Sequence, residues 1–75
     1  MTININTYFD NVAINMTAEQ ITGGRHEKWK LTFDRSIEQI PDEIIKKAAS
    51  TVSWLWMPTI SRTGNNSVIY SGYID

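Results

Sequence analysis

The chain has 75 residues, of which 41% are hydrophobic, with seven Lys and Arg against eight Asp and Glu and no cysteine. A chain of this length buries only about 60% of its unfolded surface, so we expect one small domain over residues 1–75 and exclude a large multidomain enzyme. The absence of cysteine removes a disulfide framework and a thiolate nucleophile, and it predicts a cytoplasmic protein. The longest apolar run, residues 54–58, is far too short for a membrane span, so no membrane partner is expected.

The first predicted element is a β-hairpin over residues 12–33 with Gly23 and Gly24 as a two-residue loop. Glycines suit the positive φ angles of such a tight turn. Counting outward from the turn shows which residues of the two strands lie opposite each other. One face becomes apolar, and the other face brings Glu19 opposite Lys28. The predicted apolar pairs are Ile14 with Phe33, Met16 with Leu31, and Ala18 with Trp29.

Two alternatives remain open in this first part of the chain. Thr17-Ala18-Glu19-Gln20 has the spacing of a helix capping box, but Gly23 would end such a helix after one turn. Ile3 and Ile5 alternate with asparagines, which suggests an edge strand if Asp10-Asn11 turns the chain.

A helix is predicted from about residue 41 to residue 56. Pro41 suits the first helical position, and the acidic Asp42 and Glu43 oppose the positive end of the helix dipole. Pro58 must lie beyond the helix, because the residue before a proline avoids the helical region. The predicted apolar stripe consists of Ile44, Ile45, Ala48, Val52, Leu55 and Trp56.

A second hairpin is predicted from residues 59–62 and 67–74, around the turn sequence Thr63-Gly64-Asn65-Asn66. The fold class is therefore α+β, with one helix packed on a small, mainly antiparallel sheet. The expected order is strand, strand, helix, strand, strand.

The sequence shows no combination of residues that suggests catalysis. His26 is the only histidine, and no nucleophile or second metal ligand is recognisable beside it. The glycines at the first turn lack the strand-to-helix context and the Lys-Ser or Lys-Thr pair of a phosphate-binding loop. We therefore expect a non-enzymatic protein with no cofactor and no metal.

The charges are unevenly distributed along the chain. Residues 44–74 contain Lys46, Lys47 and Arg62 and no acid, whereas residues 1–43 hold seven acids and four bases. Together with nearby tyrosines and tryptophans, these cations make a small nucleic-acid-binding module the alternative hypothesis. Nucleic-acid-binding domains usually carry an excess of basic residues, so the pI of about 5.7 favours a protein-binding role over this alternative.

Trp54 is the most informative single residue for function. If the helix reaches Met57, Trp54 lies away from the apolar stripe and Trp56 points inward. If a strand has begun, both tryptophans share one face, and Leu55 and Met57 share the other. An exposed indole on a small domain is a candidate anchor for a partner protein. The predicted binding residues are Trp54, Arg62, Tyr73, Lys46 and Lys47.

These features predict a small binding protein that inhibits or regulates a larger protein complex by occupying its surface. In size and type, the cysteine-free α+β chain resembles the small proteins with which phages and plasmids block host machinery, anti-CRISPR proteins among them. That similarity implies a rigid scaffold, an exposed patch and no reaction chemistry. A homodimer remains open.

Overall fold

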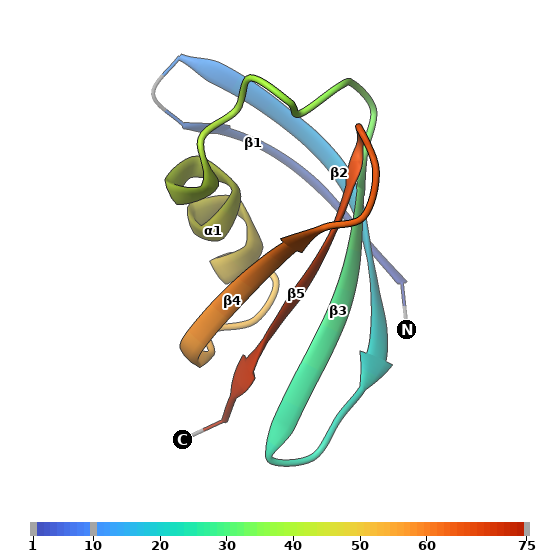
Figure 1. Ribbon diagram of the computed structural model, residues 1–75, viewed down its shortest axis with the longest axis vertical. Helices are drawn as coiled ribbons and strands as arrows, with labels where there is room; N and C mark the ends of the chain where they lie inside the picture. Colours follow the sequence, from blue (N-terminus) through green and yellow to red (C-terminus); the bar gives the residue numbers. More distant parts are fainter. Residues whose placement is uncertain (1, 10, 75) are drawn as a thin grey trace.

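The computed structural model describes residues 2–9 and 11–74 (Figure 1). It contains five strands, one helix and a single sheet in which every neighbouring pair is antiparallel, in the order β1-β2-β3-β5-β4. The elements are β1 (Thr2–Phe9), β2 (Val12–Thr22), β3 (His26–Phe33), α1 (Asp42–Ser50), β4 (Trp56–Arg62) and β5 (Ser67–Tyr73).

The α+β class is confirmed, but the expected element order is wrong, because three strands precede the helix. The additional strand is β1, which pairs with β2 along its whole length. Ile3 and Ile5 pack against the core, while Asn4 and Asn6 are exposed, as the alternation in the sequence predicts. Asn11 has a φ of 66°, which suits a tight turn, and its predicted turn partner Asp10 lies outside the described residues.

The first hairpin exists, but its predicted pairing is shifted by two residues. Met16 lies opposite Phe33 rather than Leu31, and Glu19 lies opposite Lys30 rather than Lys28. The shift has two causes: the loop has three residues, 23–25, and the ladder is interrupted at Ile21. A shift of two leaves every side chain on its predicted face, so the apolar face is the buried one.

The helix α1 is shorter than the predicted segment 41–56, and Pro41 is its N-cap rather than its first helical residue. In the last turn, Ser50 Oγ donates to the carbonyl of Lys47 at 2.7 Å and Thr51 Oγ1 donates to that of Ala48 at 2.6 Å. Such side-chain bonds to the backbone compete with further helix, and the chain leaves the helix here.

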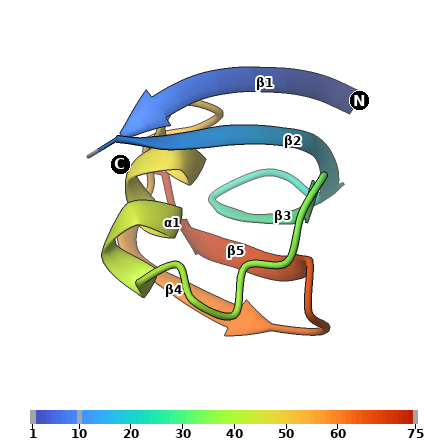
Figure 2. The same ribbon diagram turned by 90° about the horizontal axis from the view of Figure 1, so that it is seen from above.

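The helix connects two strands that run in the same direction, since β3 and β4 both pair antiparallel with β5. Figure 2 shows the sheet curling, so that β1 and β2 lie opposite β4 and β5 with α1 at the open side. The helix contacts both edge strands, β1 and β4. The enclosed core consists of Ile14, Met16, Ala18, Trp29, Leu31, Phe33, Ile37, Ile40, Ile44, Ile45, Ala48, Ala49, Leu55, Val68 and Tyr70.

Candidate functional site

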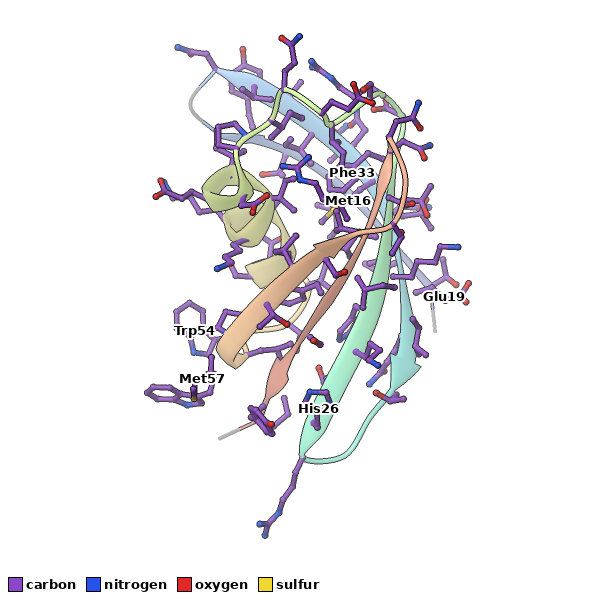
Figure 3. All side chains as sticks on the ribbon, in the orientation of Figure 1. Met16, Glu19, His26, Phe33, Trp54 and Met57 are labelled. Atoms are coloured by element: carbon purple, nitrogen blue, oxygen red, sulfur yellow. The ribbon has the colours of Figure 1, made fainter. Side chains whose placement is uncertain are left out.

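Large apolar side chains are exposed together at the corner where the loop after α1 enters β4. We call this group the Trp54 corner. Figure 3 shows Trp54 and Met57 there, both pointing away from the body of the molecule. The members and their exposed fractions are Trp54 75%, Trp56 54%, Met57 77% and Tyr73 54%. Because large apolar side chains gathered on one surface are a feature of binding sites, this corner is the leading candidate.

The outward direction of both tryptophans follows from the burial of the residue between them. Leu55 is 3% exposed, and its Cβ would lie 2.7 Å from a Cβ atom added at Gly72. Only a glycine at that position of β5 lets Leu55 enter the core. In an extended chain, neighbouring side chains point to opposite sides, so Trp54 and Trp56 turn outward.

The prediction that Trp56 points inward is therefore wrong. The helix ends six residues earlier than expected, and Trp56 begins β4 opposite Tyr73. The alternative of an early strand placed Trp54 and Trp56 on one face correctly. It also placed Met57 beside Leu55, which does not hold because Met57 is exposed.

A β-bulge explains the exposure of Met57. The β4–β5 register shifts between Trp56 and Thr59, and Met57 has a φ of 49°. A positive φ costs about 1–3 kcal/mol for a residue other than glycine, so the surrounding contacts must hold it. The bulge adds Met57 to the exposed corner.

A hydrogen-bond network fixes the chain just before Trp54. Ser53 Oγ donates to Glu27 Oε1 at 2.6 Å, and the same carboxylate oxygen accepts from Trp29 Nε1 at 3.0 Å. The hydroxyl of Tyr70 donates to the carbonyl of Ser53 at 3.0 Å. Burial raises the pKa of Tyr70, a backbone hydrogen bond at Leu55 partly offsets the rise, and the Glu27 carboxylate adds to it, so the phenol stays protonated and keeps donating. The loop is thereby tied to β3 and β5.

A groove of about 290 Å³ runs beside the corner, between α1 and the start of β4. Two lysines of α1 contribute the cationic part of its lining, and the remaining lining is mainly apolar. The lining residues are Lys46, Lys47, Ser50, Trp54, Leu55, Trp56, Met57, Pro58 and Tyr70. An apolar centre beside cationic side chains suits a partner with an apolar anchor and acidic surroundings.

Four of the five predicted binding residues lie in this region. Lys46, Lys47 and Trp54 line the groove, and Tyr73 lies opposite Trp56 on the adjacent strand. Trp56 and Met57 were not among the site residues predicted from the sequence. Pro58 is the available signal for both, because a proline in a strand is found at edges and bulges.

Arg62 lies at the other end of β4, where its hydrogen bonds stabilise the fold. Its guanidinium donates to the carbonyls of Ile37 and Ile40, both at 2.6 Å, and to the Asp42 carboxylate at 2.8 Å. These bonds tie the end of β4 to the segment that leads into α1. The structure thus separates Arg62 from the other four predicted site residues.

His26 and the carboxylates form no recognisable reactive group in the part of the chain that the structure describes. The His26 ring packs edge-on against Tyr73 with 4.9 Å between ring centroids. Within residues 2–9 and 11–74, no three His, Cys, Asp or Glu side chains converge as metal ligands would. No helix among these residues is long and apolar enough to cross a membrane.

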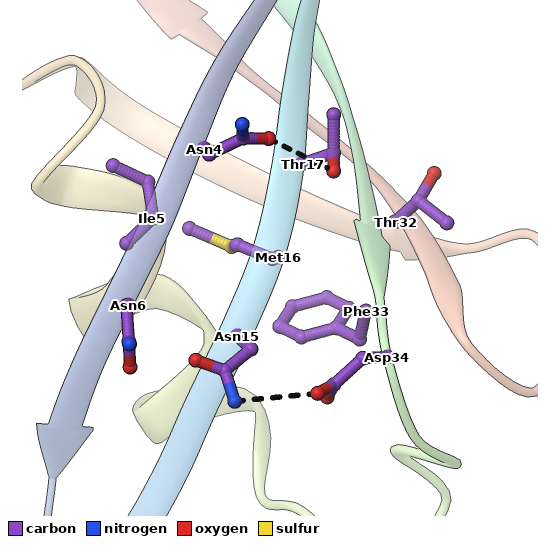
Figure 4. A pocket seen from close by; sticks show the side chains of 9 residues that line it. All are labelled: Asn4, Ile5, Asn6, Asn15, Met16, Thr17, Thr32, Phe33 and Asp34. Carbon is purple, nitrogen blue, oxygen red and sulfur yellow. Dashed lines mark hydrogen bonds between the residues drawn. The ribbon is translucent and has the colours of Figure 1, made fainter.

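A second hollow, of about 360 Å³, lies on the polar face of β1, β2 and β3 (Figure 4). Asn15 Nδ2 donates to Asp34 Oδ2 at 3.2 Å, and Thr17 Oγ1 donates to Asn4 Oδ1 at 3.3 Å. Asp34 is the only ionisable residue in the lining, so the hollow offers no acid–base pair. It is a weaker candidate than the Trp54 corner.

No family model, no curated protein and no solved structure matches the chain. The geometry of the Trp54 corner is therefore the basis for inferring a function.

Proposed function

We propose that this chain is a small, non-enzymatic binding protein that inhibits or regulates a larger protein complex by occupying its surface. The contact surface is the Trp54 corner. The observation that carries the proposal is the position of Trp54, which is 75% exposed between two fixed neighbours, the hydrogen-bonded Ser53 and the buried Leu55.

This arrangement supports binding because it reduces the conformational entropy that the loop around Trp54 loses when a partner binds. Tryptophan is among the residues that contribute most at protein interfaces. A loop that is already held in one conformation loses little freedom on association, so more of the contact energy remains as affinity. Met57, on its bulge, adds a flexible side chain that can adapt to the partner.

The class of protein proposed is a cytoplasmic inhibitor of the kind that phages and plasmids direct at host machinery. Two features support this class: the small α+β scaffold and an exposed aromatic corner, without a recognisable catalytic group among the described residues. A protein that acts by covering a surface requires only such a scaffold and such a patch.

The test is an affinity capture from the natural host with three versions of the tagged chain. Wild type is expected to retain a specific partner, and Trp54→Ala should weaken its binding by about 30-fold or more, as for an interface hot spot. Ile21→Ala is the matched control, because Ile21 is another exposed apolar residue, on β2 outside the corner. Equal retention by Trp54→Ala and wild type would refute the proposed contact surface.

A second candidate is binding of single-stranded nucleic acid, which the placement of Lys46 and Lys47 beside two tryptophans favours. Arg62 is bonded within the fold. With Lys46 and Lys47 counted as about two phosphate contacts, log K should fall against log salt with a slope of about −1.4. A gel shift with an unstructured oligonucleotide tests this candidate. Lys46→Glu with Lys47→Glu should abolish such binding and leave most of an aromatic-centred protein contact intact.

A further inference from the structure

The sheet has two edge strands, β1 and β4, and they differ in how they resist pairing with another strand. An edge strand presents unpaired backbone N–H and C=O groups that can pair with any extended chain. In β4, the bulge at Met57 distorts the edge and Pro58 lacks an N–H donor. These two features protect β4.

None of these protective features is present in β1. All eight residues of β1 pair with β2 without a register shift, and its sequence, TININTYF, contains no charge and no proline. Figures 1 and 2 place α1 near the C-terminal end of the strand, so that its N-terminal part extends beyond the helix. This part of β1 is an open and regular edge.

From this edge we infer that β1 pairs antiparallel with β1 of a second copy across a two-fold axis, which joins the two sheets into one. A two-fold contact requires a strand that is complementary to itself. β1 meets this requirement because Ile3 and Ile5 share one face, and Asn4 and Asn6 share the other. A pairing that keeps the two core faces on one side therefore places apolar residues together and amides together.

Two registers fit this two-fold pairing, and both avoid unfavourable contacts. One places Asn4 opposite its own copy and Ile3 opposite Ile5; the other places Asn4 opposite Asn6 and Ile5 opposite its own copy. Neither register brings like charges together, since β1 has none. The formal net charge of −1 adds little repulsion between two copies. The partly buried Ile3 and Ile5 would lose some of their remaining contact with water.

Sedimentation velocity across a concentration series tests the inference on the full chain. Wild type is expected to pass from one chain mass to twice that mass by about 1 mM, where even weak complexes are populated. The variant Asn4→Lys with Asn6→Lys should weaken dimerisation at least about tenfold, because both registers then place lysine opposite lysine. Thr59→Lys with Ser61→Lys makes the same charge change on exposed residues of β4 and should leave dimerisation unchanged.

A charge-swap mixture separates loss of pairing from loss of folding. Asn4→Glu with Asn6→Glu should likewise be monomeric by itself, and mixing it with the lysine variant should restore a dimer of one chain of each kind. Hydrogen exchange should show β1 amides protected with increasing protein concentration in the wild type. The inference is overturned if the wild type remains monomeric at about 1 mM, if the β4 control weakens the dimer equally, or if the mixture restores no dimer.

Discussion

Gly72 of β5 lies directly beneath Leu55, and a Cβ atom on Gly72 would lie 2.7 Å from the Cβ of Leu55 and 2.8 Å from the carbonyl oxygen of Trp56. Gly72→Ala should therefore destabilise the protein by about 1–3 kcal/mol, the usual cost of overpacking. It should also displace the loop that carries Trp54. Urea denaturation followed by tryptophan fluorescence measures the loss. Gly64→Ala is the control and should cost less, because a Cβ atom on Gly64 would lie 3.2 Å from the hydroxyl oxygen of Ser67 and near no backbone atom.

The three residues 54–56 should respond differently to truncation. Leu55→Ala should cost about 2–5 kcal/mol, because it leaves a cavity in the core. Trp54→Ala and Trp56→Ala should each change stability by less than about 1 kcal/mol, since both side chains are mainly exposed. Thermal melts of the three variants measure the differences. A greater loss for Trp54→Ala than for Leu55→Ala would contradict the described path of the loop.

Arg62 should contribute to stability through backbone carbonyls more than through its ion pair. Arg62→Met keeps the aliphatic part but removes the donors to the carbonyls of Ile37 and Ile40, and should cost about 2–3 kcal/mol. Asp42→Asn removes only a partly exposed ion pair and should cost less than about 1 kcal/mol. Urea midpoints measure both effects. Arg35→Met, at an exposed arginine, is the control and should be nearly neutral.

Stability should fall in alkaline solution because of Tyr70. Burial raises its pKa above the ordinary 10.0, and the Glu27 carboxylate adds to the rise. The folded state then holds the phenolic proton more tightly than the unfolded state, so this stability is complete below pH 10.0 and is lost as pH rises through the folded pKa.

Urea denaturation at about pH 8 and about pH 11 measures the alkaline loss. Tyr70→Phe should lose about 1 kcal/mol at the lower pH, because the bond to the Ser53 carbonyl disappears. The same variant should show a smaller alkaline loss than the wild type. Tyr73→Phe, at a ring that is 54% exposed, is the matched control and should keep the alkaline loss of the wild type.

The sequence by itself determined which face of the first hairpin is buried. Ile14, Met16 and Leu31 lie inside as predicted, because a strand alternates its side chains and the alternation survives a shift of two residues. It did not determine which residues face each other. That pairing depends on a three-residue loop and on the bulge at Ile21, and the packed sheet selects both.

The second hairpin and the start of the helix were also determined by local signals, the turn of residues 63–66 and the proline and acids near residue 41. Only the tertiary structure decided where the helix ends and what Trp56 and Arg62 contact. Helical spacing describes neighbours along one helix, whereas Leu55 is buried against Gly72 and Arg62 bonds to Ile37. Those partners are distant in the sequence, so only the folded chain brings them together and turns the tryptophans outward.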